Sequence, residues 1–502
     1  MTRASAPAPV SQEDPRPRCL PSEEGAILFE QILDKGRFRP DARGAAAKLV
    51  DDFLSAVQTQ PLGPDEELID RIDEILADID QRLSNQLNEI LHVPELQRLE
   101  GSWRGLHHLV MESNTGTGLQ IRLINVSKKD LARDLERAPE SDQSGFFKKI
   151  YEDEFGMPGG TPYGVLVGDY EFTQHPQDID LLTRISRVAA AAWAPFISAA
   201  GPALFGMDRF DELARPRDLA KIFEGDDCIK WRQFRETEDS RWVGLCLPRT
   251  LQRLPYGEAT RPVEEFRFEE DVFGDRAHDK YLWGNAAYAF ATRVTDAIDR
   301  SNWPVAIRGL EGGGRVSGLP VHTFRSDSGE LASKCPTEVA ITDRRDRELD
   351  RLGFIPLCHY RNTDYAVFFA ARSAQKPKSY DLPVAQANAD LSCQLQYLLA
   401  MARFTHYLKV IQRDKLGSSL SAANVERYLN DWIAQYVLLS DEAGPELKAK
   451  QPLREARVTV TERAGQPGCY DVTLSLRPHF QLEELDVSLR LVASLDRPKR
   501  DA

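Results

Sequence analysis

The sequence lacks any apolar run near ~18 residues, the length that a helix needs to cross a bilayer, so we predict no membrane insertion. Its seven cysteines include no C-x-x-C pair, and the odd count fits reduced thiols in a cytosol rather than a disulfide framework or a zinc site. The formal net charge of −14 argues against a general nucleic-acid binder, which needs a basic face. Residues 1–21 lack the apolar core of a signal peptide and are typical of a disordered tail.

Motifs that hold phosphates or metals are also missing. The glycine-rich loop at residues 312–318 has no Gly-Lys-Ser/Thr, so it cannot serve as a Walker A loop. The sequence contains no His-Glu-x-x-His, no Gly-x-Ser-x-Gly and no dinucleotide-binding glycine pattern between a strand and a helix. His107 and His108 are adjacent on a predicted helix and point in different directions. We therefore predict no cofactor and no metal site.

One pair of acidic residues is a candidate for catalysis. Asp169 and Glu171 lie two apart at the end of a predicted strand, where side chains at i and i+2 share a face. Two carboxylates on one face can meet and shift each other's pKa. A solvated strand end explains the same two residues. A cytosolic α/β enzyme that uses Asp169 and Glu171 is therefore the alternative to a function without catalysis.

The most informative stretch is residues 87–110, which predict the end of one helix, a break at Pro94 and the start of another helix. Gly101 and Gly105 fall on one face of the second helix, where each costs roughly 1 kcal/mol against alanine. Close approach of a second element, with Trp103 in the same packed region, explains them. An ordinary amphipathic helix with tolerated glycines is the other interpretation. The apolar stripe of this helix has spacings of three and four and consists of Leu96, Leu99, Trp103, Leu106 and Val110.

The chain divides into three predicted parts. Residues 1–64 form the tail and short helices, and residues 65–375 form an α+β region that opens with a long periodic helix at residues 65–91. Residues 376–502 form a C-terminal domain. In the first part, a helix over residues 22–34 either binds a groove on a partner or docks on its own domain. Its narrow apolar face consists of Ile27, Leu28, Ile32 and Leu33.

The middle region mixes helices and strands without regular βαβ alternation, which favours an α+β fold over a doubly wound sheet. Helices are predicted at residues 178–200, 282–298 and 344–352. Strands are predicted at residues 119–123, 163–172, 242–247, 339–342 and 366–370.

The C-terminal domain follows a proline-containing linker at residues 373–389 and begins with helices at residues 391–413 and 422–439. Alternating apolar residues then predict a hairpin with its turn at residues 465–468, and a third strand at residues 485–491. The edges of such a sheet offer unpaired backbone groups and invite strand addition from a neighbouring chain. Long helices and a pairable sheet, without a convincing active site, favour an assembly protein over an enzyme.

Several long strings occur in an order that resembles one known family. They are Leu99-Glu-Gly-Ser-Trp-Arg-Gly-Leu-His-His-Leu109, Ser127-Lys-Lys-Asp-Leu131, Phe147-Lys-Lys-Ile-Tyr-Glu-Asp-Glu-Phe-Gly156, Gly164-Val-Leu-Val-Gly-Asp-Tyr-Glu171 and Arg477-Pro-His-Phe-Gln-Leu-Glu-Glu-Leu485. From about residue 65 to 495 the chain resembles the large subunit of the type VI secretion contractile sheath, the TssC/VipB/EvpB/ImpC family. The resemblance implies an α+β sheath core and a C-terminal sheet completed by strands of neighbouring subunits.

The resemblance also implies a structural role in a bacterial cytoplasm, with no covalent step. The large subunit of this family pairs with a small sheath subunit, and copies of the pair build a phage-tail-like helical tube on a baseplate around an inner-tube protein. Contraction propels the inner tube and its effectors into a neighbouring cell during bacterial competition. A AAA+ unfoldase then dismantles the contracted sheath.

Three groups of residues take their expected roles from the resemblance. The helix that contains Ile27 falls where family members can carry an unfoldase-recognition motif, although this sequence departs from that motif. The helix over residues 424–435 lies in the part that would line the lumen, so Glu426 and Asp431 are expected to face the inner tube. The positions expected to exchange strands between neighbouring subunits are Val458, Val460, Val472, Leu474 and Leu476.

Overall fold

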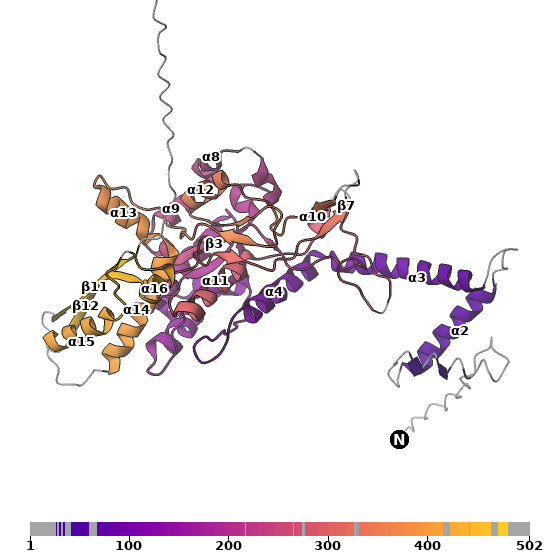
Figure 1. Ribbon diagram of the computed structural model, residues 1–502, viewed down its shortest axis with the longest axis horizontal. Coiled ribbons are helices and arrows are strands. Elements are labelled where there is room, and N and C mark those ends of the chain that lie inside the picture. The colour runs from indigo at the N-terminus through magenta and orange to yellow at the C-terminus, as the bar shows by residue number, and fades with distance from the viewer. Residues whose placement is uncertain are drawn as a thin grey trace, which may run out of the picture. The chain divides into compact units, whose positions relative to one another are not determined.

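Backbone contacts divide the chain into two compact units (Figure 1). The first unit comprises Met1–Val93 and Pro255–Phe273, and the second comprises Pro94–Leu254 and Gly274–Ala502. The structure is a computed structural model, and the residues that it describes are 27, 30–31, 34–35, 42–59, 68–215, 217–264, 266–273, 277–325, 329, 331–414, 422–440, 442–462 and 470–479.

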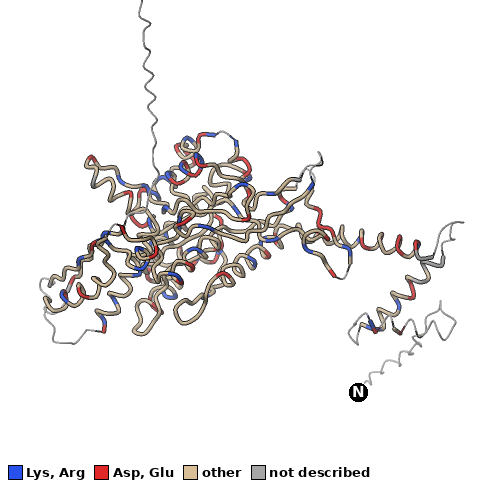
Figure 2. Tube along the Cα trace, in the orientation of Figure 1, with Lys and Arg blue, Asp and Glu red and all other residues tan. Residues whose placement is uncertain are grey.

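The first unit is built on the helices α2 (Arg43–Thr59) and α3 (Leu68–Leu91). α3 is the long periodic helix that the sequence predicts, and Figure 2 shows acidic residues recurring along it. The loop at residues 255–273 is fixed to α3 by Asn88. Its Nδ2 donates to the carbonyl oxygen of Glu269 (3.2 Å), and its Oδ1 accepts from the Asp271 N–H (3.0 Å). One amide side chain therefore satisfies two backbone groups of this loop.

The second unit contains a six-stranded sheet in the order β1-β2-β3-β9-β10-β6. β1, β2, β3 and β9 pair in parallel, and β10 is antiparallel to both β9 and β6. The mixed α and β architecture that the sequence predicts is confirmed. However, β1, β2 and β3 are consecutive along the chain and adjacent and parallel in the sheet, which is a more regular arrangement than predicted. Their bounds are β1 (Leu166–Phe172), β2 (Phe196–Ala200), β3 (Val243–Leu247), β6 (Arg315–Val316), β9 (Ile355–His359) and β10 (Ala366–Phe368).

Helices cover the first three strands of this sheet. α7 (Pro176–Ala192) and α11 (Ala286–Ser301) both pack on β1, β2 and β3, and Figure 1 shows α11 beside β3. Every residue of β2 and of β3 is buried. Because strands with both faces covered are apolar at consecutive positions, they carry no alternating pattern that a sequence search could recognise.

The helix predicted over residues 178–200 is wrong in its second half. α7 ends at Ala192, Trp193 takes a left-handed conformation with φ of 53°, and β2 begins at Phe196. Pro195 explains the break, because a proline disfavours the helical conformation at the residue before it. The apolar run after Pro195 is therefore a buried strand.

Two predicted strands are absent from the part of the chain that the structure describes. Residues 119–123 and 339–342 are irregular and pair with no described strand. In the first segment Leu123 is exposed by 65%. An alternating pattern becomes a strand only where a neighbouring strand supplies the ladder of hydrogen bonds, and neither segment has one.

Shorter elements complete the second unit. Small two-stranded sheets are formed by β4 (Thr250–Leu251) with β5 (Trp283–Gly284) and by β7 (Thr323–Arg325) with β8 (Leu331–Ser333). The short helices are α5 (Lys128–Arg137), α6 (Gly145–Phe147), α8 (Leu219–Glu224), α9 (Ile229–Glu236), α10 (Ala277–Lys280) and α12 (Asp343–Arg351), with a π-helix η2 (Lys148–Gly156). Single 3-10 turns are η1 (Ser141–Gln143), η3 (Pro202–Phe205), η4 (Phe210–Ala214), η5 (Asp226–Cys228) and η6 (Asp239–Trp242).

The C-terminal part contains the predicted pair of antiparallel strands, β11 (Leu453–Glu462) and β12 (Tyr470–Pro478). Val458 pairs with Leu474, and Val460 pairs with Val472. The predicted turn at residues 465–468 and the third strand at residues 485–491 lie outside the described residues. Four helices precede the strands: α13 (Pro383–Ser392), which begins inside the predicted linker, α14 (Leu395–Asp414), α15 (Ala422–Ala434) and α16 (Pro445–Lys450).

α4 (Pro94–Met111) packs on the rest of the second unit through its two glycines. A Cβ atom added at Gly101 would lie 3.2 Å from the carbonyl oxygen of Trp283, and one at Gly105 would overlap the ring of Tyr288 on α11. Carbon atoms are normally in contact at about 3.5–4.0 Å, so Gly105 has no room for a side chain. The glycines of α4 thus allow the close approach that the sequence suggests.

Gly105→Leu should lower the melting temperature of the full chain, because the new side chain overlaps Tyr288 and overpacking typically costs ~1–3 kcal/mol. Arg98→Ala, an exposed position on the same helix, is the control and should leave the midpoint unchanged. Scanning calorimetry of both variants makes the comparison. Equal midpoints would show that α4 is not held on α11 at Gly105.

Candidate functional site

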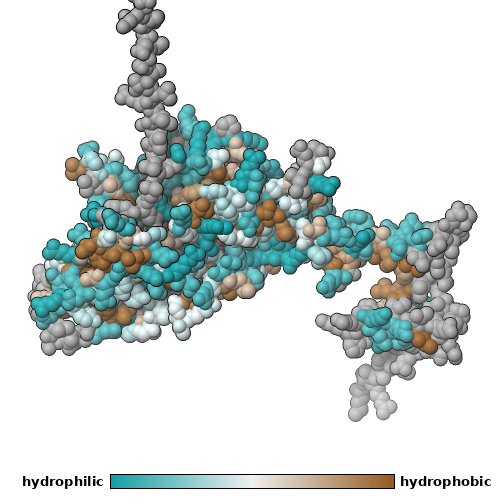
Figure 3. Space-filling model, viewed as in Figure 1, coloured by the Kyte–Doolittle hydropathy of each residue, from teal (hydrophilic) through white to brown (hydrophobic). Residues whose placement is uncertain are grey.

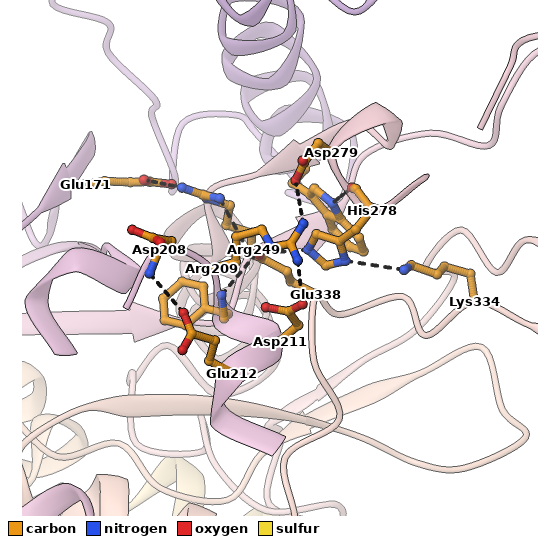
Figure 4. A network of polar contacts seen from close by, with 12 residues as sticks. Glu171, Asp208, Arg209, Asp211, Glu212, Arg249, His278, Asp279, Lys334 and Glu338 are labelled. Atoms are coloured by element: carbon orange, nitrogen blue, oxygen red, sulfur yellow. Dashed lines mark hydrogen bonds and ion pairs between the residues drawn. The ribbon is translucent and has the colours of Figure 1, made fainter. Parts of the chain in front are cut away.

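Glu171 does not form a catalytic pair with Asp169. Arg249 holds its carboxylate through two hydrogen bonds, Nε to Oε1 at 2.6 Å and Nη2 to Oε2 at 2.7 Å (Figure 4). Asp169 accepts instead from Nδ2 of Asn285 at 3.4 Å. Burial opposes the charge of Arg249, but the hydrogen bonds and charge of Glu171 raise its pKa above the usual value. The predicted carboxylate pair is therefore wrong, because each member has its own structural partner.

Arg249 belongs to a larger polar network in the second unit. The Glu338 side chain is only 1% exposed and faces Nη1 of Arg249 (3.7 Å) and Nε2 of His278 (3.2 Å). Nδ1 of His278 lies 3.4 Å from Nζ of Lys334, and burial lowers the pKa of that lysine. Figure 4 shows these side chains converging from separate segments. The carboxylates Glu171 and Glu338 are both engaged with cations, so the network stabilises the fold and offers no free general base.

Arg249→Met should destabilise the chain by about 3 kcal/mol, because it leaves Glu338 buried without its arginine and Glu171 without its bidentate partner. Arg209→Met is the matched control. Arg209 forms two exposed ion pairs, with Asp211 (3.1 Å) and Asp279 (3.4 Å), and pairs of that kind contribute ~0–1 kcal/mol. Chemical denaturation measures the free energy of unfolding of both variants. If Arg249→Met lowers it no more than the control does, the assigned structural role of Arg249 is contradicted.

Part of the apolar stripe of α4 is uncovered within the described residues. Leu99, Trp103 and Val110 are exposed by 56%, 60% and 39%, whereas Leu96 and Leu106 are half-buried. Met111, at the end of the helix and outside the stripe, is exposed by 70%. The prediction that Trp103 shares the packed region of the glycines is wrong, because the glycine face makes the internal contact and the tryptophan lies on another face. Large apolar side chains gathered on a surface mark an interface with another protein, where tryptophan is enriched.

α3, in the first unit, shows the same feature. Three residues that recur along its periodic apolar face, Ile79, Leu83 and Ile90, are exposed by 38% to 48%, and the neighbouring Leu76 is exposed by 45%. Figure 3 shows apolar and hydrophilic residues side by side along this helix. Among the described residues, this part of the apolar face of α3 is therefore left in water.

The two edges of the β11–β12 sheet differ. On the outer edge of β11, the backbone of Val458 bonds to the side chain of Asn430, and the Val460 N–H donates to Glu426. On β12, the backbone groups of Val472, Leu474 and Leu476 face away from β11 and have no partner within the described residues. Of the five positions expected to exchange strands, the three on β12 are therefore the ones whose edge no described residue covers.

A groove of about 850 Å³ lies beside the end of β12. Figure 3 shows apolar residues gathered on the surface between the positions that Figure 1 labels α13 and β11. The open edge of β12 thus borders an apolar surface. The residues of the groove that come from α13, α14 and β12 include Leu391, Tyr397, Met401, Phe404 and Leu476.

The two acidic residues expected to face an inner tube do not share a face. On an α-helix, residues five apart are rotated by about 140°, and Glu426 is directed to Val460 of β11 whereas Asp431 is exposed. Glu426 is therefore engaged within its own chain, and a contact of either residue with an inner tube stays a prediction. In the predicted unfoldase helix, Ile27 is described and is 58% exposed, whereas Leu28, Ile32 and Leu33 lie outside the described residues.

Within the described residues, no group of three or more His, Cys, Asp or Glu side chains is placed to hold a metal ion. The helices of the described chain also include none with the length and apolar character of a membrane span.

Two protein-family models match the chain. Residues 73–375 match VipB, the EvpB tail sheath N-terminal domain, and residues 384–495 match VipB_2, the EvpB tail sheath gpW/gp25-like domain. These matches define a tail sheath protein. The type VI secretion system sheath protein TssC1 of Pseudomonas aeruginosa is 47% identical over 482 residues, which are 95% of this chain and 96% of that protein. The chain therefore belongs to the TssC/VipB family of type VI secretion sheath large subunits, which are structural components of a contractile sheath and not enzymes.

Solved structures of other contractile systems are more distant. The baseplate of the anti-feeding prophage matches with a TM-score of 0.38 and 9% identity over 75% of this chain and 83% of that chain. The helical sheath of the same prophage in its contracted state matches with a TM-score of 0.29 and 11% identity over 74% and 84%.

Proposed function

We propose that this sheath subunit pairs with a small sheath subunit through the apolar stripe of α4, and that the pairs polymerise around an inner tube and contract to propel it. The observation that carries the pairing is the exposure of Trp103, Leu99 and Val110 on a helix whose other face is already packed. A partner that covers these side chains would gain roughly 25 cal/mol of binding free energy for each Å² of apolar surface removed from water. A single partner can cover them together, because α4 holds them on one rigid element.

Strand addition at β12 would join neighbouring subunits. The backbone groups of Val472, Leu474 and Leu476 offer a ladder to an extended segment, and the side chains of these residues already pack on the core of α14 and α15. An incoming strand with alternating apolar and polar residues would extend that core and cover the groove beside Leu476. The opposite face of the hairpin is polar, with Thr473 and Ser475 exposed, so the sheet can accept a strand while one face stays in water.

The remaining partners follow from the family. An inner-tube protein would lie within the sheath, with Asp431 of α15 as a residue exposed to it, and baseplate components would hold one end. A AAA+ unfoldase would recognise the N-terminal helix that contains Ile27. The chain would act in the bacterial cytoplasm.

Co-expression with the small sheath subunit tests this function directly. We expect hollow tubules in negative-stain micrographs of the wild-type pair. Small monodisperse particles under every assembly condition would contradict the proposal.

Trp103→Ser combined with Leu99→Ser should abolish most tubules without unfolding the chain, because both side chains are already in water. Truncation of a central aromatic residue typically costs ~2 kcal/mol or more, which is about 30-fold in affinity. Ile229→Ser, at an apolar residue of α9 that is 43% exposed, is the control and should assemble normally. Pull-down of the small subunit and tubule counts provide the measurement, and normal pairing by the double variant would rule out α4 as the contact.

A further inference from the structure

The outer edge of β11 is closed by groups that are not a strand. The side chain of Asn430, on α15, donates from Nδ2 to the Val458 carbonyl (2.7 Å) and accepts the Val458 N–H at Oδ1 (3.0 Å). One amide therefore presents to Val458 the donor and the acceptor that a neighbouring peptide group would present. Glu426, one turn earlier on α15, accepts the Val460 N–H at Oε2 (3.0 Å).

The start of the same edge is closed by backbone. The Leu453 N–H donates to the carbonyl of Tyr436 (3.2 Å), and the Leu438 N–H donates to the carbonyl of Leu453 (2.8 Å). Contacts by α15 and the segment after it thus run along β11 from Leu453 to Val460. Nδ2 of Asn430 also donates to the Glu426 carbonyl (2.8 Å), which holds the amide in place.

α15 cannot leave this edge freely. Leu429 and Ile433 on the same helix are 0% and 1% exposed, in the core that also contains Val458. A strand arriving at β11 would have to break the contacts of Asn430 and Glu426 and expose these two side chains. A strand arriving at β12 would break no hydrogen bond within the described residues.

We infer that Asn430 and Glu426 form an edge latch, which pairs with β11 in place of a strand and directs the incoming strand of a neighbouring subunit to β12. The latch rests on the proposed strand addition and specifies where it occurs. It also prevents the β11 edges of two free subunits from pairing, which is the hazard of an uncovered sheet edge. The two residues are therefore specificity-determining, since they select the receiving edge without contacting the incoming strand.

Hydrogen–deuterium exchange with residue-level fragmentation tests the latch on the full chain co-expressed with the small subunit. Unassembled subunits and sedimented tubules are compared. In unassembled subunits, the amides of Val458 and Val460 should exchange at least about 10-fold more slowly than those of Val472, Leu474 and Leu476. In tubules, the three β12 amides should slow by at least about 10-fold, whereas the two β11 amides should change little.

Substitutions separate the latch from general folding. Asn430→Leu should speed exchange of the Val458 amide about 10-fold in unassembled subunits, because leucine has no acceptor, whereas Asn424→Leu at an exposed site of α15 should not. Glu426→Leu should release the Val460 amide, and Glu426→Gln should retain its protection because the amide oxygen can still accept. If Asn430→Leu does not fold, the Glu426 pair still decides the question.

Three results would overturn the inference in distinguishable ways. Fast exchange at Val458 and Val460 before assembly, with protection gained there in tubules, would show that strands add to β11 and that the latch is wrong while strand addition is right. If the amides of neither β11 nor β12 exchange more slowly in tubules, both the proposed strand addition and the choice of β12 as the receiving edge are contradicted. Unchanged exchange in Asn430→Leu and Glu426→Leu would show that these side chains do not hold the edge.

Discussion

The contact between Gly105 and the ring of Tyr288 decides how α4 lies on the second unit. Because no side chain fits at that point, the helix approaches α11 closely, and its rotation about its own axis is fixed. The face that remains outward then carries Leu99, Trp103 and Val110. An internal packing constraint at a glycine thus leaves an apolar helix surface available to a partner, which connects the stability of the free subunit to its proposed ability to assemble.

The charged network around Arg249 lies inside the second unit and stabilises its fold, whereas the proposed assembly surfaces are apolar helix faces and a strand edge. Arg249 links the end of β1 to the segment after β8, because it binds both carboxylate oxygens of Glu171 and its Nη1 faces Glu338. A sheath subunit that moves as a body during contraction needs such internal connections. In the proposed function its partners would meet helix faces and a strand edge.

The sequence was sufficient to predict elements that a local residue pattern defines. It was insufficient for features that depend on which other segments of the fold lie next to them. The periodic residues of α3, the glycines of α4 and the alternation in β11 and β12 were sufficient to predict those elements. The strand β2 was missed although Pro195 marks the end of α7, because an alanine-rich buried strand resembles a helix. Trp103 was placed inside, since an apolar stripe does not reveal whether its own chain or another covers it. The hydrogen bonds between Asn430 and the backbone of β11 could not be predicted either, because they join residues 28 apart and no sequence spacing indicates such a contact.

Hydroxyl-radical footprinting of Trp103 and Met111 tests the central claim, that the outward face of α4 is an assembly surface. Both side chains are oxidisable and more than half exposed in the subunit. We expect strong oxidation in the unassembled chain and protection of both residues when the small subunit is bound and in tubules. Equal oxidation of Trp103 and Met111 in free chain, bound pair and tubules would contradict the account.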